Sequence, residues 1–214
     1  MGPNKQIAGV SGVILAGGSS SRMGSNKALL PHMGGRFIES ISRQMEELFE
    51  EILLVTNTPE QYQFLHCRKV ADRHVGMGPL AGIHAGLLDA CNPRILAVAC
   101  DMPYISGKII RYLAELDEQA DVIIPRTAEG LEPLHALYGK RCLPAIDDVL
   151  LSGRKRIISF FARVSVREVA TDSLPECTQS FSAFRNVNTP EDYYRLREEE
   201  LLAGKTVTRL RQAA

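Results

Sequence analysis

Short apolar runs and helical stretches alternate along the chain. The apolar runs cover residues 13–15, 52–56, 94–100 and 122–125. They do not alternate with polar residues, so each is predicted to be a strand covered on both faces. Apolar positions recur at spacings of three and four over residues 37–49, 83–90 and 108–116, which is typical of helices with one buried face. This order predicts an α/β fold, a three-layer α/β/α sandwich around a mostly parallel, Rossmann-like sheet.

The ends of the chain are predicted from local signals. Thr189 is a good helix N-cap, Pro190 suits the first helical position, and acidic residues follow in the first turn. We expect this last helix to run to about Leu202. No linker is visible, so residues 1–214 are expected to form a single domain, with residues 1–10 and 205–214 as flexible tails.

Charge and cysteine content exclude several classes of protein. Lysine plus arginine and aspartate plus glutamate both total 25, and this balance disfavours nucleic acid as a partner. No apolar run reaches the ~18 residues of a membrane span, and the first ten residues lack the apolar segment of a secretion signal. The five cysteines are widely spaced without a CxxC pair, which disfavours a zinc site or redox dithiol. We therefore expect a cytoplasmic protein with no membrane partner.

A glycine-rich segment follows the first predicted strand directly. Residues 15–27 read LAGGSSSRMGSNK. Glycines let backbone N–H groups approach phosphate oxygens, and Arg22 and Lys27 supply the countercharge that a triphosphate needs. The segment is neither a GxxxxGK[ST] loop nor a GxGxxG loop, and a flexible turn is the alternative. Its position favours the phosphate site, because open α/β sheets bind ligands at the carboxyl ends of their strands.

Three further polar residues follow predicted strands or turns. Asp101 ends the third apolar run, where a carboxylate can hold Mg²⁺ against a phosphate; Ser106 is the better cap for the next helix. Asn57 follows the second run and is a candidate contact to base or ribose, with a simple turn residue as an equal alternative. Asp72 precedes the glycine-rich stretch of residues 76–82 and by itself reads as a turn residue.

The segment at residues 15–27 resembles the signature LAGGxSxRMGxxK of the molybdenum cofactor guanylyltransferase family, the MobA type of nucleotidyltransferase, and matches it at every fixed position. The resemblance implies the same fold class. It implies a GTP cradle formed by Leu15, Ala16, Gly17 and Gly18, with Arg22, Lys27 and Asp101 as catalytic residues. It also implies that Asp101 is the metal ligand, in a CDMP segment, and that Asp72 contacts nucleotide or metal in a DxxxGxGPLAGI segment.

The C-terminal half carries further parts of the resemblance. The stretch at 184–192 is similar to a closing FxNVNTPED motif, in which Asn186 and Asn188 would bind the acceptor; a capping turn is the alternative, and both can hold. His135, in a segment similar to the family's PLHALY, is more often structural than catalytic at such a place. The basic residues at 154–156 either grip an anionic acceptor or form a solvated turn.

The resemblance implies a reaction. GMP would pass from GTP to the phosphate of molybdopterin or molybdenum cofactor, giving the guanine dinucleotide form and pyrophosphate, with Mg²⁺ as cofactor. Such chemistry needs mainly positioning and charge stabilisation. We expect the nucleotide over residues 15–27, 72 and 101, and the acceptor over the C-terminal half.

Alternatives stay open at this point. They are a related cytidylyltransferase, a sugar-phosphate nucleotidyltransferase, and a nucleotide-binding module that delivers the cofactor. Protein partners would be molybdopterin-handling proteins or target molybdoenzymes. The spacing of the residues does not indicate which base is read.

Overall fold

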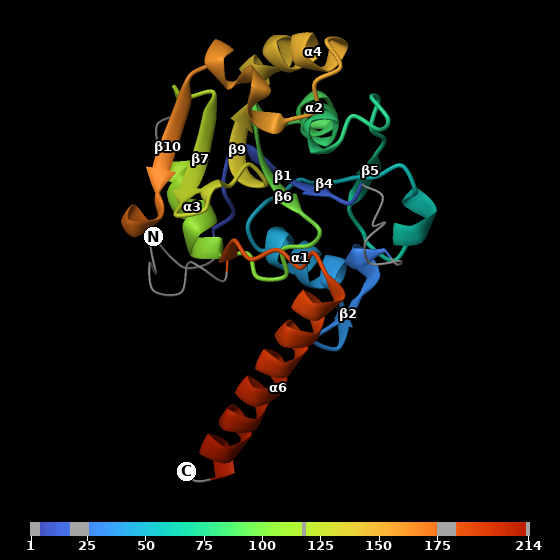
Figure 1. Ribbon diagram of the computed structural model, residues 1–214, viewed down its shortest axis with the longest axis vertical. Helices are drawn as coiled ribbons and strands as arrows, with labels where there is room; N and C mark the ends of the chain where they lie inside the picture. Colours follow the sequence, from blue (N-terminus) through green and yellow to red (C-terminus); the bar gives the residue numbers. More distant parts are fainter. Residues whose placement is uncertain (1–4, 18–25, 117–118, 175–182, 213–214) are drawn as a thin grey trace.

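The computed structural model describes residues 5–17, 26–116, 119–174 and 183–212, with the backbone alone for residues 203–212. An eight-stranded sheet has the order β10-β7-β9-β6-β1-β4-β5, with β8 beside β7, and a two-stranded hairpin joins β2 to β3. The strands are β1 Val10–Leu15, β2 Pro31–His32, β3 Gly35–Arg36, β4 Ile52–Val55, β5 Arg68–Val70, β6 Arg94–Ala99, β7 Val122–Thr127, β8 Gly130–Leu131, β9 His135–Gly139 and β10 Val166–Ala170. The α-helices are α1 Phe37–Glu46, α2 Pro79–Asp89, α3 Gly107–Glu115, α4 Leu143–Leu151 and α6 Pro190–Gln212 (Figure 1).

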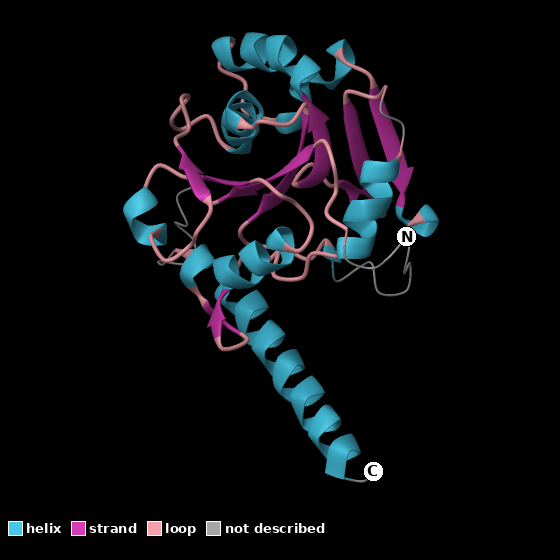
Figure 2. Ribbon diagram, turned by 180° about the vertical axis from the view of Figure 1, so that it is seen from behind, coloured by secondary structure: helices cyan, strands magenta, loops and turns pink. Residues whose placement is uncertain are grey.

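The sheet is mostly parallel and covered on both faces, which confirms the predicted three-layer fold. β1 runs parallel to β4 and β6, and further parallel pairs join β4 to β5 and β7 to β10. β9 is antiparallel to both β6 and β7. Helices α1 and α3 cover one face and α2 and α4 the other, as both views show (Figures 1 and 2).

The apolar run of β1 shows why its residues do not alternate with polar ones. Ile14 packs into the core that α1 and α3 share, whereas Val13 and Leu15 pack into the core beside α2. All three side chains are buried. A strand in this position needs apolar residues on both faces, as the sequence pattern predicts.

The register of the parallel strands brings the loops that follow these strands together, at the edge of the sheet formed by their carboxyl ends. Leu15 pairs with Val55 on one side and with Ala99 on the other, and Val55 pairs with Val70. The last residues of β1, β4, β5 and β6 are therefore level with one another. The glycine-rich loop, Asn57, Asp72 and Asp101 all begin from this edge, where ligands bind in open α/β sheets.

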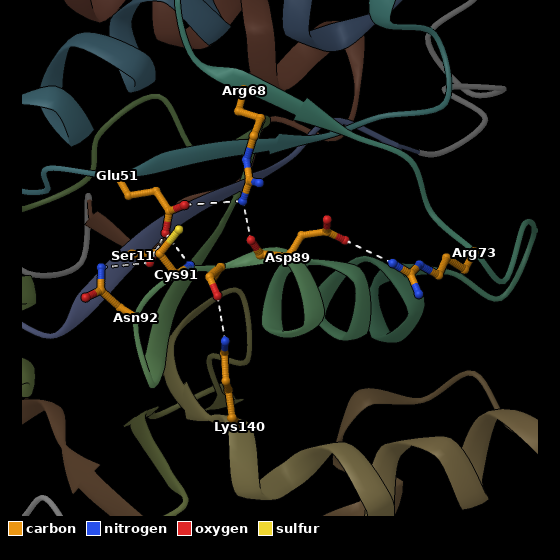
Figure 3. Close-up of polar contacts among 9 residues, drawn as sticks. Ser11, Glu51, Arg68, Arg73, Asp89, Cys91, Asn92 and Lys140 are labelled. Atoms are coloured by element: carbon orange, nitrogen blue, oxygen red, sulfur yellow. Dashed lines mark hydrogen bonds and ion pairs between the residues drawn. The ribbon is translucent and has the colours of Figure 1, made fainter.

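A polar network lies at the other end of the parallel strands, where these strands begin (Figure 3). The carboxylate of Glu51 accepts hydrogen bonds from Ser11 Oγ at 2.5 Å and from Cys91 N at 2.8 Å. Arg68 donates to the same carboxylate at 3.2 Å and to the carbonyl of Asp89. These contacts join β1, β5 and the end of α2 to the residue that precedes β4.

Residues 5–10 and 205–212, which the sequence analysis expects in flexible tails, make hydrogen bonds or form helix in the described part of the chain. Ile7 N donates to Leu48 O at 2.8 Å, and Gln6 Nε2 donates to Phe49 O at 3.1 Å, so residues 5–10 pack against the molecule instead of forming a loose tail. Helix α6 continues to Gln212, beyond the expected end at Leu202, so residues 205–212 are helical.

Two other helices also differ from the prediction. α2 begins at Pro79, four residues before the expected start, because Gly78 with a φ of 72° turns the chain and Pro79 occupies the first turn. α4 was not predicted, although Ile146, Val149 and Leu150 are buried at helical spacing. Within the described residues, no helix is both long and apolar enough to cross a membrane.

Candidate functional site

A hollow of about 540 Å³ opens at the carboxyl edge of β1, β4 and β6. We call it the first hollow. It is lined by Leu15, Gly17, Val55, Thr56, Asn57, Asp72, Val75, Gly76, Gly78, Pro79, Gly82, Ala99, Cys100, Asp101 and Leu134. The structure thus brings Leu15, Gly17, Asn57, Asp72 and Asp101, which the sequence analysis singled out, to one place.

Lys27 is positioned by the residue before it. Asn26 caps the 3-10 helix Lys27–Leu29, because its Oδ1 accepts from Ala28 N at 3.1 Å. The Asn26 amide nitrogen is itself held by Tyr62 Oη at 2.9 Å. From this fixed base the Lys27 ammonium lies 3.8 Å from Asp101 Oδ2 and donates to Asn188 Oδ1 at 3.0 Å.

Asp101 is a partly buried carboxylate in the first hollow. Its side chain is 23% exposed, and burial raises its pKa above the usual range while the Lys27 ammonium acts in the opposite direction. Its carbonyl accepts from Val187 N at 2.9 Å. The closing motif therefore packs directly along the strand end that carries Asp101.

Asn57 and Asp72 form a hydrogen-bonded pair of turns beside Asp101. Asn57 Oδ1 accepts from Asp72 N at 2.9 Å, and Asp72 Oδ1 accepts from His74 N at 2.7 Å. Both side chains thus shape the loop that lines the first hollow. The structure supports the alternative in which Asn57 and Asp72 are turn residues. Contact of either residue with a nucleotide stays a prediction.

The glycines of residues 76–82 have two different roles. Gly76 and Gly78 have φ values of 80° and 72°, which other residues rarely adopt, so they shape the loop itself. Gly82 lies inside α2, where an added Cβ would come within 3.0 Å of Leu15 Cδ2. Its small size lets α2 pack closely against the end of β1.

A second hollow of about 480 Å³ lies beside the closing motif. We call it the second hollow. Its lining is Thr127, Ala128, Glu129, Glu132, Phe184, Arg185, Asn186, Asn188 and Asp192. Asn188 belongs to this lining and also touches Lys27. The residues expected for nucleotide and acceptor therefore adjoin at Lys27.

The alternative reading of this motif as a helix cap also holds. Asp192 N donates to Thr189 Oγ1 at 3.1 Å, and Asp192 Oδ2 accepts from the backbone N of Asn188 and of Thr189 at 3.0 and 2.9 Å. This reciprocal capping at the start of α6 fixes the backbone of Asn188. Only the backbone of Asn188 takes part in the cap, and its side-chain Oδ1 accepts the hydrogen bond from Lys27.

Comparison with known proteins gives the family. A model of the MobA-like NTP transferase domain matches residues 12–168. A protein of Carboxydothermus hydrogenoformans, named "Probable molybdenum cofactor guanylyltransferase", is 42% identical, covering 86% of this chain and 92% of its own. A molybdenum cofactor guanylyltransferase of Desulfosudis oleivorans is 32% identical over 92% and 98% of the two chains.

The chain belongs to the MobA-like NTP transferase family. A solved structure is similar as well: molybdopterin-guanine dinucleotide biosynthesis protein A from Archaeoglobus fulgidus, with a TM-score of 0.76 and 25% identity, covering 88% of this chain and 97% of that one. The expected α/β nucleotidyltransferase fold is thus confirmed, and this protein is a nucleotidyltransferase.

His135 has a structural place in this nucleotidyltransferase. Its ring is fully buried in β9, where burial lowers its pKa to about 4, and it packs edge-on against Phe184 at 5.0 Å. A ring held neutral within the core is a poor proton acceptor for a substrate. The structure supports the structural alternative for His135.

Of the basic residues at 154–156, Lys155 reaches the loop that lines the first hollow. Lys155 Nζ donates to Gly76 O at 2.8 Å, while Arg154 Nε donates to Ser152 Oγ at 2.9 Å. Lys155 therefore borders the loop of residues 72–78. Contact of these basic residues with an anionic acceptor stays a prediction.

Some residues lie outside the sequence prediction or outside the described structure. Thr127, Glu129 and Glu132 line the second hollow but were not predicted. Glu129 lies in a short turn between β7 and β8, and isolated acids in such turns give no signal. Gly18 and Arg22 fall outside the described residues, so their expected phosphate contacts stay predictions.

Proposed function

We propose that this nucleotidyltransferase moves the GMP unit of GTP to the terminal phosphate of molybdopterin or molybdenum cofactor. The products are the guanine dinucleotide form of the cofactor and pyrophosphate. The observation that carries the proposal is the position of Lys27, whose ammonium touches Asp101 of the first hollow and Asn188 of the second. A cation there faces both a nucleotide triphosphate and an anionic acceptor. The relatives named molybdenum cofactor guanylyltransferase support the choice of guanine and of this acceptor.

The transfer itself forms one bond and breaks one. An acceptor phosphate oxygen bonds to the α-phosphorus of GTP, and the bond from that phosphorus to the oxygen leading to the β-phosphorus breaks. Pyrophosphate leaves with the electron pair. The acceptor phosphate is already ionised at neutral pH, so no side chain has to remove a proton. Lys27 stabilises the negative charge on the phosphates, and Asn188 orients the Lys27 ammonium.

Asp101 fits the expected Mg²⁺ by its chemistry. It offers a partly exposed carboxylate oxygen in the first hollow, and Mg²⁺ prefers oxygen ligands, often one or two carboxylates together with substrate phosphates. When bound there, Mg²⁺ would neutralise charge on the phosphate oxygens and favour departure of pyrophosphate. Burial raises the pKa of Asp101, and a bound cation would favour its charged form, as the Lys27 ammonium already does.

The remaining roles follow from position. Leu15, Ala16 and Gly17 begin the loop that we propose as the phosphate cradle, and Gly18 and Arg22 would complete it. Asn186, in the lining of the second hollow, is proposed to bind the acceptor.

The cellular setting is also part of the proposal. The thiols of Cys67, Cys91, Cys100 and Cys142 are free, which suits a reducing compartment and supports a cytoplasmic location. Molybdopterin-handling proteins and target molybdoenzymes stay predicted protein partners.

The test is nucleotide choice. The protein is titrated calorimetrically with GTP, ATP and CTP in the presence of Mg²⁺, and pyrophosphate is measured after addition of molybdopterin. We expect GTP to bind best and to release pyrophosphate only when molybdopterin is present. A site that hydrogen-bonds guanine leaves polar groups unpaired against adenine. Equal affinities for the three nucleotides would contradict the guanine assignment, and turnover with CTP alone would favour the cytidylyltransferase.

A further inference from the structure

Two histidines and an aspartate from three different elements meet beside the first hollow. His74 lies in the loop before α2, His84 lies in α2 and Asp147 in α4. One ligand atom from each residue lies within 4.8 Å of the other two. His84 Nε2 is 2.7 Å from Asp147 Oδ1, and the two histidine rings lie edge-on with centroids 5.1 Å apart.

We propose that His74, His84 and Asp147 bind a divalent transition metal of the zinc class. Two imidazoles and one carboxylate are the donors that Zn²⁺ and Co²⁺ accept, whereas Mg²⁺ prefers oxygen ligands alone. The site is thus chemically distinct from Asp101. Cysteine spacing argued against a zinc site in the sequence analysis, and this cluster uses no cysteine.

The geometry of the cluster suits an open metal site. Zinc bonds of about 2.0–2.2 Å place neighbouring ligand atoms roughly 3.3–3.5 Å apart. His84 Nε2 and Asp147 Oδ1, which are 2.7 Å apart, would separate slightly, and His74 would approach them from within 4.8 Å. The side chain of Asp147 is 49% exposed, which gives a path for the ion and room for water as a fourth ligand. His84 is 4% exposed and anchors the site within the protein.

The fold alone leaves His84 incompletely satisfied. Among the described residues, its Nδ1 atom is buried without a hydrogen-bond partner, while the other ring nitrogen meets Asp147. An ion held between Nε2 and Asp147 Oδ1 would leave Nδ1 unchanged. The proposal therefore rests on the nitrogen that faces Asp147 and on the approach of His74 to this pair.

The metal would fasten a loop that lines the first hollow. His74 N donates to Asp72 Oδ1, and His74 O accepts from Met77 N at 3.0 Å, so the residue is tied to both sides of its loop. The same loop carries Gly76 and Gly78 of the hollow. Binding His74 to α2 and α4 through an ion would hold this loop in one position. The inference does not depend on the proposed reaction.

Zinc binding provides the test. Protein treated with chelator and dialysed is titrated calorimetrically with Zn²⁺, and with Co²⁺ while its visible absorption is recorded. We expect one equivalent to bind, with an intense Co²⁺ spectrum typical of a four-coordinate site. His74→Gln and Asp147→Asn should each weaken binding at least about tenfold. Both side chains are partly exposed, so both variants should fold, which circular dichroism checks.

Matched controls separate this site from others. Asp148→Asn changes the exposed neighbour of Asp147, His66→Gln changes an exposed histidine elsewhere, and Asp101→Asn removes the expected magnesium ligand. All three should bind Zn²⁺ as the unmodified chain does. Absence of binding by the unmodified chain would overturn the proposal, and so would unchanged binding by Asp147→Asn and His74→Gln.

The loop-fastening role has its own measurement. Amide hydrogen exchange of residues 74–78 should slow when Zn²⁺ is added to the unmodified chain, and should not respond in Asp147→Asn. Exchange rates that are equal with and without Zn²⁺ in the unmodified chain would overturn the fastening role.

Discussion

At the scale of single residues, Lys27 joins the two hollows. Its ammonium has a carboxylate on one side and the Asn188 amide on the other, and both partners are held by backbone hydrogen bonds of the closing motif. A flexible lysine side chain loses entropy when it is held in this way. The arrangement therefore positions the charge before any phosphate is present, which is the condition for electrostatic catalysis.

The first prediction concerns Lys27 and Asn188. Lys27→Ala should weaken GTP binding by about 1.5–3 kcal/mol, because a charge-assisted contact is lost. Asn188→Ala should have a smaller effect, since it removes only the group that orients Lys27. In a double-mutant cycle measured by GTP titration, the two losses should be clearly non-additive.

Asn186→Ala is the matched control for this cycle. Asn186 is exposed and belongs to the same motif and the lining of the second hollow. It should leave GTP affinity within a few-fold and lower turnover with the acceptor. Additive losses for Lys27→Ala and Asn188→Ala would show that their contact does not matter for the nucleotide.

At the scale of elements, α2 packs closely against β1 at two glycines. Gly82 and Gly86 lie one turn apart on α2 and face the strand; a Cβ on Gly86 would meet Val13 Cγ1 at 2.9 Å and Cγ2 at 3.1 Å. Glycine is a poor helix former, by about 1 kcal/mol relative to alanine. Its presence at both positions is explained by packing, and the close approach sets the height of α2 above the first hollow.

The second prediction compares two substitutions in α2. Gly86→Ala should destabilise the protein, because overpacking against the stiff, buried Val13 costs about 1–3 kcal/mol and exceeds the gain in helix propensity. Gly82→Ala should cost less, since it meets the tip of Leu15 at 3.0 Å, which can move more easily. Urea denaturation of both variants provides the measurement. A Gly86→Ala protein as stable as the original would contradict this account of the packing.

The third prediction concerns the network around Glu51 (Figure 3). Burial acts to raise the pKa of Glu51, but hydrogen bonds from Ser11 and Cys91 N together with Arg68 lower it below its ordinary value of 4.5. A lowered pKa contributes stability above the unfolded pKa and loses it as the pH falls through the folded pKa. Glu51→Gln should therefore lower the free energy of unfolding by about 1–3 kcal/mol at neutral pH.

The pH dependence and a neighbouring residue provide the controls for Glu51. The difference between the original chain and Glu51→Gln should shrink as the pH falls below 4.5. Glu50→Gln, at an exposed position, should change little. A difference that grows in acid would mean that the sign of the pKa shift is wrong.

At the scale of the whole molecule, much of the fold could be predicted and its long-range contacts could not. Apolar runs without alternation require a sheet covered on both faces, and parallel strands bring Gly17 and Asp101 to one edge. The contact of Lys27 with Asn188 joins residues that are 161 positions apart. It depends on how the chain returns across the sheet, and no local pattern records this. The cluster of His74, His84 and Asp147 could not be predicted from the sequence for the same reason.

The limits of the helices could not be predicted well either. Among the described side chains of α6, residues 190–202, Leu196 is buried, while the helical backbone continues to Gln212 and extends away from the sheet (Figure 1). Helix α2 begins in a glycine-rich segment that resembles a loop in composition. There the backbone geometry of Gly78 and Pro79, not the pattern of buried residues, decides where the helix begins.

The central claim is that the α-phosphate of GTP passes to an acceptor phosphate beside Lys27 and Asp101. The most direct measurement follows GTP labelled at the α-phosphorus, incubated with Mg²⁺ and molybdopterin, in the original chain and in Asp101→Asn. The substitution keeps the carbonyl that binds Val187, so the fold should be intact, while the carboxylate that can hold Mg²⁺ is lost. We expect the label in the dinucleotide product and none in pyrophosphate for the original chain, and no labelled product for Asp101→Asn. Label that appears only in free GMP, or turnover by Asp101→Asn equal to that of the original chain, would contradict the claim.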